Sequence, residues 1–254
     1  DLGYYDGEVD GDFGGGTEEA VRLYQRQNGL DVDGIAAEKT FASLYSDQAK
    51  QVTITPTPDP AQMPLLVNRE HPVGADYQPD DLVKLKNVMP SSLVTVKGSD
   101  IEGDRTAANA MIEMFEAAEA DGVTGWQISA GYRSYDYQQQ LFDEQVAEYR
   151  AEGFTQEKAV SATRNTVADP GSSEHHTGLA FDITVAGTIF KGTEQQIWLH
   201  EHCWDYGFII RYQEDKEQIT GFLAECWHIR YVGLPHSTEM RDRNLCLEEY
   251  LGEA

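Results

Sequence analysis

Apolar residues recur with a helical period in four stretches of the chain beyond residue 100. The clearest is RTAANAMIEMFEAAEA, residues 105–120, where Gly122 follows as a stop signal. The same period runs through residues 135–153, which end on a glycine, through 155–168 and through 194–207. We therefore predict four helices in this part of the chain.

Other stretches carry the pattern of strands. The sequence GLAFDITV, residues 178–185, alternates with period two, as a half-buried strand does. We also predict a strand that runs into a loop within residues 123–134, a strand within 226–233, and a closing helix in the tail, residues 240–254. Because strands and helices mix without a regular strand–helix–strand repeat, the pattern predicts an α+β domain.

A proline-rich segment separates this domain from a small N-terminal one. Four of the nine prolines fall in QVTITPTPDPAQMP, residues 51–64. Prolines at this density prevent a packed helix or a central strand, so the segment is expected to be an extended, semi-rigid linker. We therefore divide the chain into a small domain at residues 1–47, a linker at 48–64, and a larger domain at 65–254.

The N-terminal domain contains a short internal sequence repeat. VDGDFGGGT, residues 9–17, and VDGIAAEKT, residues 32–40, have the same eight-residue step from Val to Thr. Each VDG is a turn signal, and Thr17 and Thr40 could each cap a following helix, the first ending at Gly29. This pattern predicts two loop–helix units that share one core.

A calcium loop is the alternative interpretation of DGEVDGDFGGGTE. The carboxylates of Asp6, Glu8 and Asp10 have suitable offsets, but the twelfth position is Thr17, where such a loop needs a bidentate Glu. Acidic turns are the better account. The stretch from Leu2 to Leu44 instead resembles the peptidoglycan-binding module appended to many wall hydrolases, which implies a small all-α, non-catalytic anchoring domain.

Composition narrows the possible partners. Acidic residues outnumber basic ones by 44 to 19, which gives a formal net charge of −25. Such a surface repels nucleic acid and anionic lipid, so we expect neither as a partner, and no apolar run is long enough to span a membrane. An odd count of cysteines without a CxxC pair indicates core residues, although one disulfide stays open: Cys203, Cys226 and Cys246.

Asp182 lies in the middle of the apolar strand GLAFDITV, where an ionised carboxylate needs a partner. A backbone cap or an arginine would suffice for a lone Asp. However, His175 lies on a loop seven residues earlier, and His228 lies in a second predicted strand. Two imidazoles and a carboxylate are suitable zinc ligands, and three protein ligands leave the fourth position open, as in catalytic sites.

Glu225 lies three residues before His228. In a regular strand the two side chains would point to opposite faces, so Glu225 must lie on a bend that enters the strand if both are to reach one ion. A carboxylate beside zinc-bound water is a general base. The simpler alternative is a surface Glu at a strand end next to a packed Trp.

Three ordered motifs resemble the zinc peptidase family M15, in its VanY-type D-alanyl-D-alanine carboxypeptidase branch. The motif S-x-H-x-x-G-x-A-x-D spans residues 173–182, E-x-W-H spans 225–228, and SAGYRSYDYQQQLF spans 129–142. The resemblance covers roughly residues 65–235. It implies the LAS fold, a small antiparallel sheet flanked by helices. It also implies that His175, Asp182 and His228 are the zinc ligands and that Glu225 is the catalytic base.

The resemblance also places Arg133 in the substrate pocket. A guanidinium can grip a terminal carboxylate through two parallel hydrogen bonds, although an Arg on such a turn is often only a solvated charge. Gln138 and Ser173 are expected to contact the peptide. His176 falls at a variable position of the motif and is left out of the site.

These features predict a secreted, cell-wall-associated enzyme, a monomer, whose signal segment has been removed. Its expected activity is removal of the terminal D-alanine from peptidoglycan stem peptides. An L,D-carboxypeptidase, a stem-peptide endopeptidase and a non-catalytic wall-binding protein are the alternatives. The last of these would be expected to lack a ligand or the base, whereas all four positions are filled.

Overall fold

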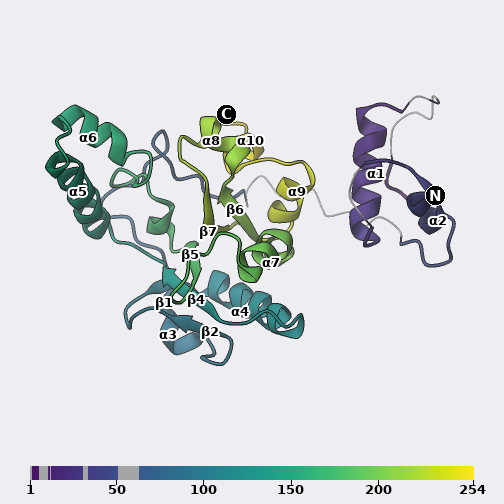
Figure 1. Cartoon of the computed structure of the whole chain (residues 1–254), viewed down its shortest axis with the longest axis horizontal. Coiled ribbons are helices and arrows are strands. Elements are labelled where there is room, and N and C mark those ends of the chain that lie inside the picture. The colour runs from purple at the N-terminus through teal and green to yellow at the C-terminus, as the bar shows by residue number, and fades with distance from the viewer. Residues whose placement is uncertain (1, 6–10, 12, 31–33, 51–62) are drawn as a thin grey trace. The chain divides into compact units, whose positions relative to one another are not determined.

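The computed structural model describes residues 2–5, 11, 13–30, 34–50 and 63–254 (Figure 1). The chain divides into two compact units, Asp1–Thr57 and Pro58–Ala254. The three carboxylates of the possible calcium loop lie outside the described residues, as does most of the predicted linker. Each unit is described by itself below.

The N-terminal unit contains two helices, α1 (Gly15–Gln27) and α2 (Glu38–Leu44). The predicted threonine caps are wrong, because Thr17 and Thr40 both lie inside the helices, and Ala37 is the N-cap of α2. Thr40 is buried and accepts a hydrogen bond from the Gln25 side chain of α1. Its hydroxyl therefore joins the two helices instead of starting the second one.

A five-stranded sheet forms the centre of the second unit. Its order is β2–β4–β5–β7–β6, in which β2 and β4 are parallel and the other three pairs are antiparallel. The strands are β2 (Val94–Val96), β4 (Trp126–Ala130), β5 (Ala180–Val185), β6 (Phe208–Tyr212) and β7 (Glu225–Tyr231). A separate antiparallel pair joins β1 (Leu82–Lys84) to β3 (Glu102–Asp104). The predicted α+β class is confirmed, with one parallel pair in the sheet.

The longer helices agree with the apolar periodicity. They are α4 (Arg105–Ala120), α5 (Tyr135–Ala151), α6 (Gln156–Thr163) and α7 (Glu194–His202), and Figure 1 shows α5 and α6 side by side. The side chain of Asp104 caps α4 by accepting hydrogen bonds from two backbone N–H groups of its first turn. The short helices are α3 (Leu85–Val88), η2 (Glu174–Thr177), η3 (Cys203–Tyr206), η4 (Glu214–Lys216) and α8 (Glu217–Thr220).

The predicted closing helix is wrong as a single element. The tail contains α9 (His236–Asp242) and α10 (Leu247–Leu251), and Asn244 between them has a left-handed φ of 51°. A residue in that conformation interrupts a right-handed helix, and asparagine tolerates it better than most side chains do.

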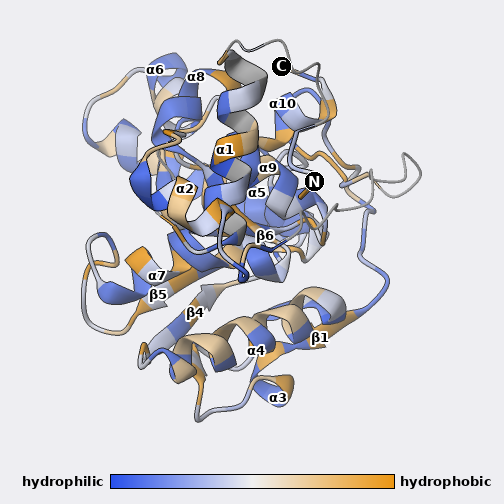
Figure 2. Cartoon of the chain, turned by 90° about the vertical axis from the view of Figure 1, so that its right-hand side faces the viewer, coloured by the Kyte–Doolittle hydropathy of each residue, from blue (hydrophilic) through white to orange (hydrophobic). Residues whose placement is uncertain are grey.

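The core lies between α4 and one face of the sheet. Phe115 of α4 contacts Trp126 of β4 with ring centroids 5.2 Å apart, and Phe181 and Ile183 of β5 are fully buried in the same cluster. Figure 2 shows apolar and hydrophilic residues alternating along α4. Because side chains alternate along β5, the burial of Phe181 and Ile183 leaves Asp182 on the opposite face.

The described residues also bear on the expectations about membrane spans and cysteines. No helix in the described part of the chain is long and apolar enough to cross a membrane. The three cysteines are free thiols: Cys203 and Cys246 are buried, and Cys226 is half-buried. The expectation of core residues therefore holds for two of the three.

Candidate metal centre

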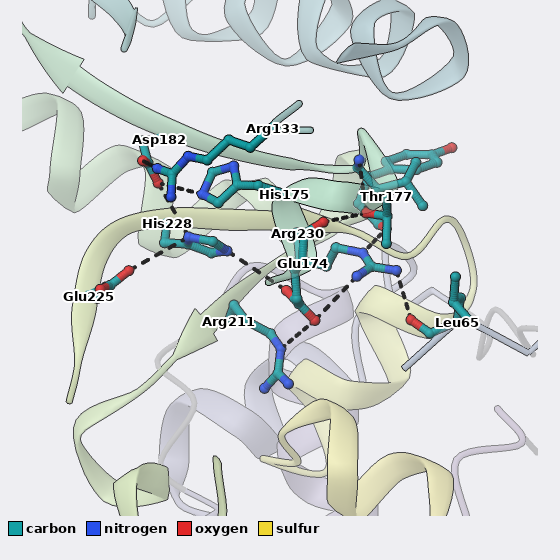
Figure 3. Close-up of polar contacts among 12 residues, drawn as sticks. Leu65, Arg133, Glu174, His175, Thr177, Asp182, Arg211, Glu225, His228 and Arg230 are labelled. Carbon is teal, nitrogen blue, oxygen red and sulfur yellow. Dashed lines mark hydrogen bonds and ion pairs between the residues drawn. The ribbon is translucent and has the colours of Figure 1, made fainter. Parts of the chain in front are cut away.

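Asp182 and His228 are direct cross-strand neighbours. The antiparallel register of β5 and β7 pairs their Cα atoms, so both side chains project from the same face of the sheet. His228 Nδ1 lies 3.2 Å from Asp182 Oδ1 (Figure 3). Two of the predicted ligands are thus brought together by strand pairing alone.

His175 reaches the same place from the short helix η2. That helix is capped by Gly178, whose φ of 70° turns the chain toward β5. His175 Nδ1 lies 2.7 Å from the carbonyl oxygen of Gly131, so it carries the proton and donates to that oxygen. Its other nitrogen, Nε2, lies 3.6 Å from Asp182 Oδ1 and faces the site.

Glu225 reaches the site because β7 is irregular. Ile210 of β6 pairs with Ile229, whereas Tyr212 pairs with Glu225, so two residues of β7 are extra at this point. Extra residues of this kind form a bulge that bends the strand, so regular alternation no longer fixes where the Glu225 side chain points. Glu225 Oε2 consequently lies 3.6 Å from His228 Nδ1. The bend that we expected where the chain enters this strand is therefore a bulge within β7.

The ligand atoms fit a metal ion. One ligand atom from each of His175, Asp182 and His228 lies within 4.8 Å of the other two. Asp182 Oδ1 is buried and has no hydrogen-bond partner, which is costly for a carboxylate oxygen unless something else satisfies it. A cation between the three groups would satisfy it, and a set of two nitrogens and one oxygen suits zinc.

The protonation of the three ligands differs. Burial lowers the pKa of His175 to about 4, and the Arg133 guanidinium adds to the effect. Burial alone would also lower the pKa of His228, but the carboxylates of Asp182 and Glu174 raise it to about 9. Burial opposes ionisation of Asp182 as well, yet the two imidazoles hold its pKa well below the ordinary value. Asp182 is therefore ionised at neutral pH, as a metal ligand must be.

The three groups line a cleft of about 430 Å³. Its lining includes Arg133, Ser173, Tyr212, Glu225 and Trp227 beside the ligands, and residues of α5 form one wall. Burial raises the pKa of Glu225 to about 7. A carboxyl group that titrates near neutral pH can both take up and release a proton during a reaction.

Arg133 also lines this cleft, and its side chain is 21% exposed. Its Nη2 donates to Asp182 Oδ2 at 3.1 Å, and its Nη1 donates to Gln138 Oε1 at 3.4 Å. Gln138 is fully buried, and its amide nitrogen donates to the carbonyl oxygen of Ala168. The described contacts of Gln138 are therefore with protein groups, whereas Ser173 lines the cleft.

Sequence reasoning missed two residues of this region. His176 accepts a hydrogen bond from Gly171 N and donates through Nδ1 to the carbonyl oxygen of Arg133, so it fixes the backbone that carries the guanidinium. Glu174 is fully buried, and although burial opposes ionisation, Arg211 and Arg230 hold its pKa below the usual range. Its signal in the sequence was the pair of arginines within two apolar strands, FIIRY and CWHIRYV.

An open centre with three protein ligands beside a carboxylate is the arrangement of catalytic zinc sites. Residues 101–234 match the family model VanY, D-alanyl-D-alanine carboxypeptidase, and the chain belongs to this family. Residues 1–44 match the model of a peptidoglycan binding domain, which supports an interaction with peptidoglycan. The predicted resemblances are thereby confirmed for both parts of the chain.

Two relatives show how far the similarity extends. A D-alanyl-D-alanine carboxypeptidase of Enterococcus faecalis is 41% identical over 187 residues, which cover 74% of this chain and 65% of the relative. A protein of the same description from Enterococcus faecium is 36% identical over 238 residues, covering 92% of this chain and 72% of the relative. The chain thus spans just under two thirds of the first relative's length.

Solved structures share the fold. A vancomycin-resistance D,D-pentapeptidase VanY from a VanB-type cassette, in complex with Zn(II), has a TM-score of 0.63 and 41% identity, and the match covers 74% of this chain and 97% of that one. The LdcB LD-carboxypeptidase has the same TM-score with 34% identity, covering 74% of this chain and 85% of that one. The predicted fold is confirmed by these likenesses.

Proposed function

We propose that the chain is a zinc carboxypeptidase that removes the C-terminal D-alanine from peptidoglycan stem peptides. The observation that carries the proposal is the convergence of His175, Asp182 and His228 beside Glu225 in one cleft. The first three residues would hold the ion. When bound, the ion supplies a Lewis acid that polarises the scissile carbonyl and makes water easier to deprotonate.

Glu225 is the general base of this proposal. It lies next to the ligands, in the cleft, with a pKa raised by burial to about 7. Its carboxylate takes a proton from the attacking water and delivers it to the nitrogen of the departing D-alanine. A general acid–base residue of this kind contributes about 10²- to 10⁴-fold to the rate.

Arg133 binds the terminal carboxylate of the substrate. Its contacts with Asp182 and Gln138 hold the guanidinium in the cleft wall and use only part of its five N–H donors. A planar guanidinium recognises a carboxylate with two parallel hydrogen bonds, which suits an enzyme that requires a free peptide end. Gln138 supports this arrangement by positioning Arg133, and Ser173 contacts the peptide from the cleft wall.

The proposal extends to the whole chain. Residues 1–47 anchor the protein to the wall, 48–64 form a linker, and 65–254 carry catalysis. A linker raises the effective concentration of stem peptides near the active site. The protein acts outside the cell, associated with the wall, as a monomer.

Defined stem peptides test this specificity. The zinc-loaded protein should shorten a pentapeptide ending in D-Ala-D-Ala by one D-alanine and leave the corresponding tetrapeptide intact, as measured by mass spectrometry. Trimming of the tetrapeptide with an intact pentapeptide would establish the L,D-carboxypeptidase alternative. Internal cleavage of either peptide would identify an endopeptidase.

The variant Glu225→Gln tests the catalytic assignment in the same assay. It should retain one zinc ion per chain, because Glu225 is outside the ligand set, and lose at least about 10²-fold in kcat. Unchanged turnover would show that Glu225 is not the general base. Loss of zinc from the folded variant would show that Glu225 is a metal ligand instead.

A further inference from the structure

Glu174 is a buried carboxylate inside the motif that carries the metal ligands. It directly precedes His175 on η2, but its side chain points into the protein and is 0% exposed (Figure 3). Its Oε1 accepts a hydrogen bond from Arg211 Nε at 2.8 Å and lies 3.2 Å from Arg230 Nη1. Its other oxygen, Oε2, is buried without a hydrogen-bond partner.

That oxygen faces the ligand histidine of β7. Glu174 Oε2 lies 3.7 Å from His228 Nε2, which is also buried and has no hydrogen-bond partner. The distance is longer than an ordinary N–H···O bond of about 2.9 Å. However, two buried polar atoms that face each other without another partner are expected to satisfy one another. The opposite nitrogen of the same ring, Nδ1, faces Asp182 and Glu225.

We propose that Glu174 is a positioning residue that accepts the Nε2 proton of His228 and so presents the Nδ1 lone pair to the metal. His175 has the mirror arrangement, because its Nδ1 donates to Gly131 and its Nε2 faces the ligands. Each imidazole then has its tautomer set by an acceptor outside the ligand set. This inference rests on the proposed metal site but is independent of the substrate.

Neutralising Arg211 does not by itself explain Glu174, whose other cationic neighbour is Arg230. Arg211 already has a second carboxylate, Glu248, which accepts hydrogen bonds from both of its Nη atoms. Glu248 is 2% exposed and contacts neither imidazole in the described network. The two glutamates therefore share Arg211 and a buried position, and they differ in which one faces His228. This difference makes Glu248 the matched control.

The test compares Glu174→Gln with Glu248→Gln in zinc affinity, measured by competition with a chromophoric chelator. Loss of an outer acceptor of a ligand histidine typically costs about 10- to 100-fold in metal affinity. We expect a loss in this range for E174Q, together with an altered visible spectrum of the cobalt-substituted protein. E248Q should lower the Tm but keep the affinity within about twofold of wild type. Equal affinities for E174Q and wild type, or equal losses in both variants, would overturn the proposal.

Two further measurements test the proposal if Glu174→Gln does not fold. Glu174→Gln combined with Arg230→Gln keeps the net charge of the buried cluster, and it should show the same loss of affinity. In the zinc-loaded wild type, long-range ¹H–¹⁵N spectra should show His228 protonated at Nε2 and ligated through Nδ1; the reverse assignment would refute the role of Glu174. A wild type that binds no zinc would instead refute the proposed function.

Discussion

Replacing Gly131 with alanine should weaken the metal site from outside the ligand set. A Cβ at this position would lie 2.3 Å from the carbonyl oxygen of Glu102, and the backbone there does not require a glycine conformation. Since an ordinary van der Waals contact is 3.4–4 Å, the backbone at Gly131 and the Glu102 carbonyl must separate by roughly 1 Å. The displaced group is the carbonyl that orients His175 through its Nδ1 proton.

The size of the effect follows from that displacement. A lost or misplaced outer acceptor costs about 10- to 100-fold in metal affinity, and a positional error near 1 Å can cost about 10²-fold in turnover. Zinc affinity of G131A, measured by chelator competition, should therefore fall by at least about tenfold. Thermal unfolding of the same preparation would show how much global stability is lost.

A matched control separates the clash from a general loss of stability. Gly187 has a φ of 76°, and a Cβ there meets nothing within 4 Å, so Gly187→Ala strains the backbone without touching any ligand or its hydrogen-bond partner. It should destabilise the protein by about 1 kcal/mol and leave zinc affinity unchanged. If G131A binds zinc as tightly as wild type, the backbone contact is not what orients His175.

Three other perturbations have defined outcomes. Zinc affinity should fall about tenfold per unit as the pH is lowered from 8 to 6, because His228, with its pKa raised to about 9, must lose a proton to bind; a flat titration would show that the imidazole is already neutral. Arg133→Met should retain zinc and lose about 10²-fold in kcat/KM, since it removes charge-assisted hydrogen bonds worth about 1.5–3 kcal/mol each; a normal value would place carboxylate recognition elsewhere. Phe115→Ala should lower the free energy of unfolding by about 3–5 kcal/mol in a denaturant titration. Ile197→Ala, at a residue 59% exposed, should change it by less than about 0.5 kcal/mol; equal effects would contradict the assigned core.

Local patterns predicted the regular elements well. The helix expected at residues 105–120 is α4, Arg105–Ala120, because its apolar spacing and its end signals agree. Strand β6 was not predicted, since FIIRY is a short, almost continuous apolar run with no period that distinguishes strand from helix. The prediction of one closing helix was wrong for a different reason. The composition of residues 240–254 favours a helix throughout, and only the backbone conformation of Asn244 interrupts it.

The residues of the candidate site could be named from the sequence because three ordered motifs resemble those of a zinc peptidase family, and the chemistry of a metal restricts its ligands to a few side-chain types. His175, Asp182, His228 and Glu225 were found in this way, and the structure brings them together. Local spacing placed Glu225 on a bend, whereas the structure uses a bulge within β7.

Tertiary structure alone decided which groups surround those residues. Nothing in the order of residues along the chain shows that Glu174 faces His228, because the contact depends on how η2, β6 and β7 pack. Periodicity reports which face of an element is apolar, and motifs report which side chains can do chemistry. The partner of a buried charge is set by strand register and bulges, which form only when distant segments pair, so the acceptors behind both imidazoles became visible only in the folded chain.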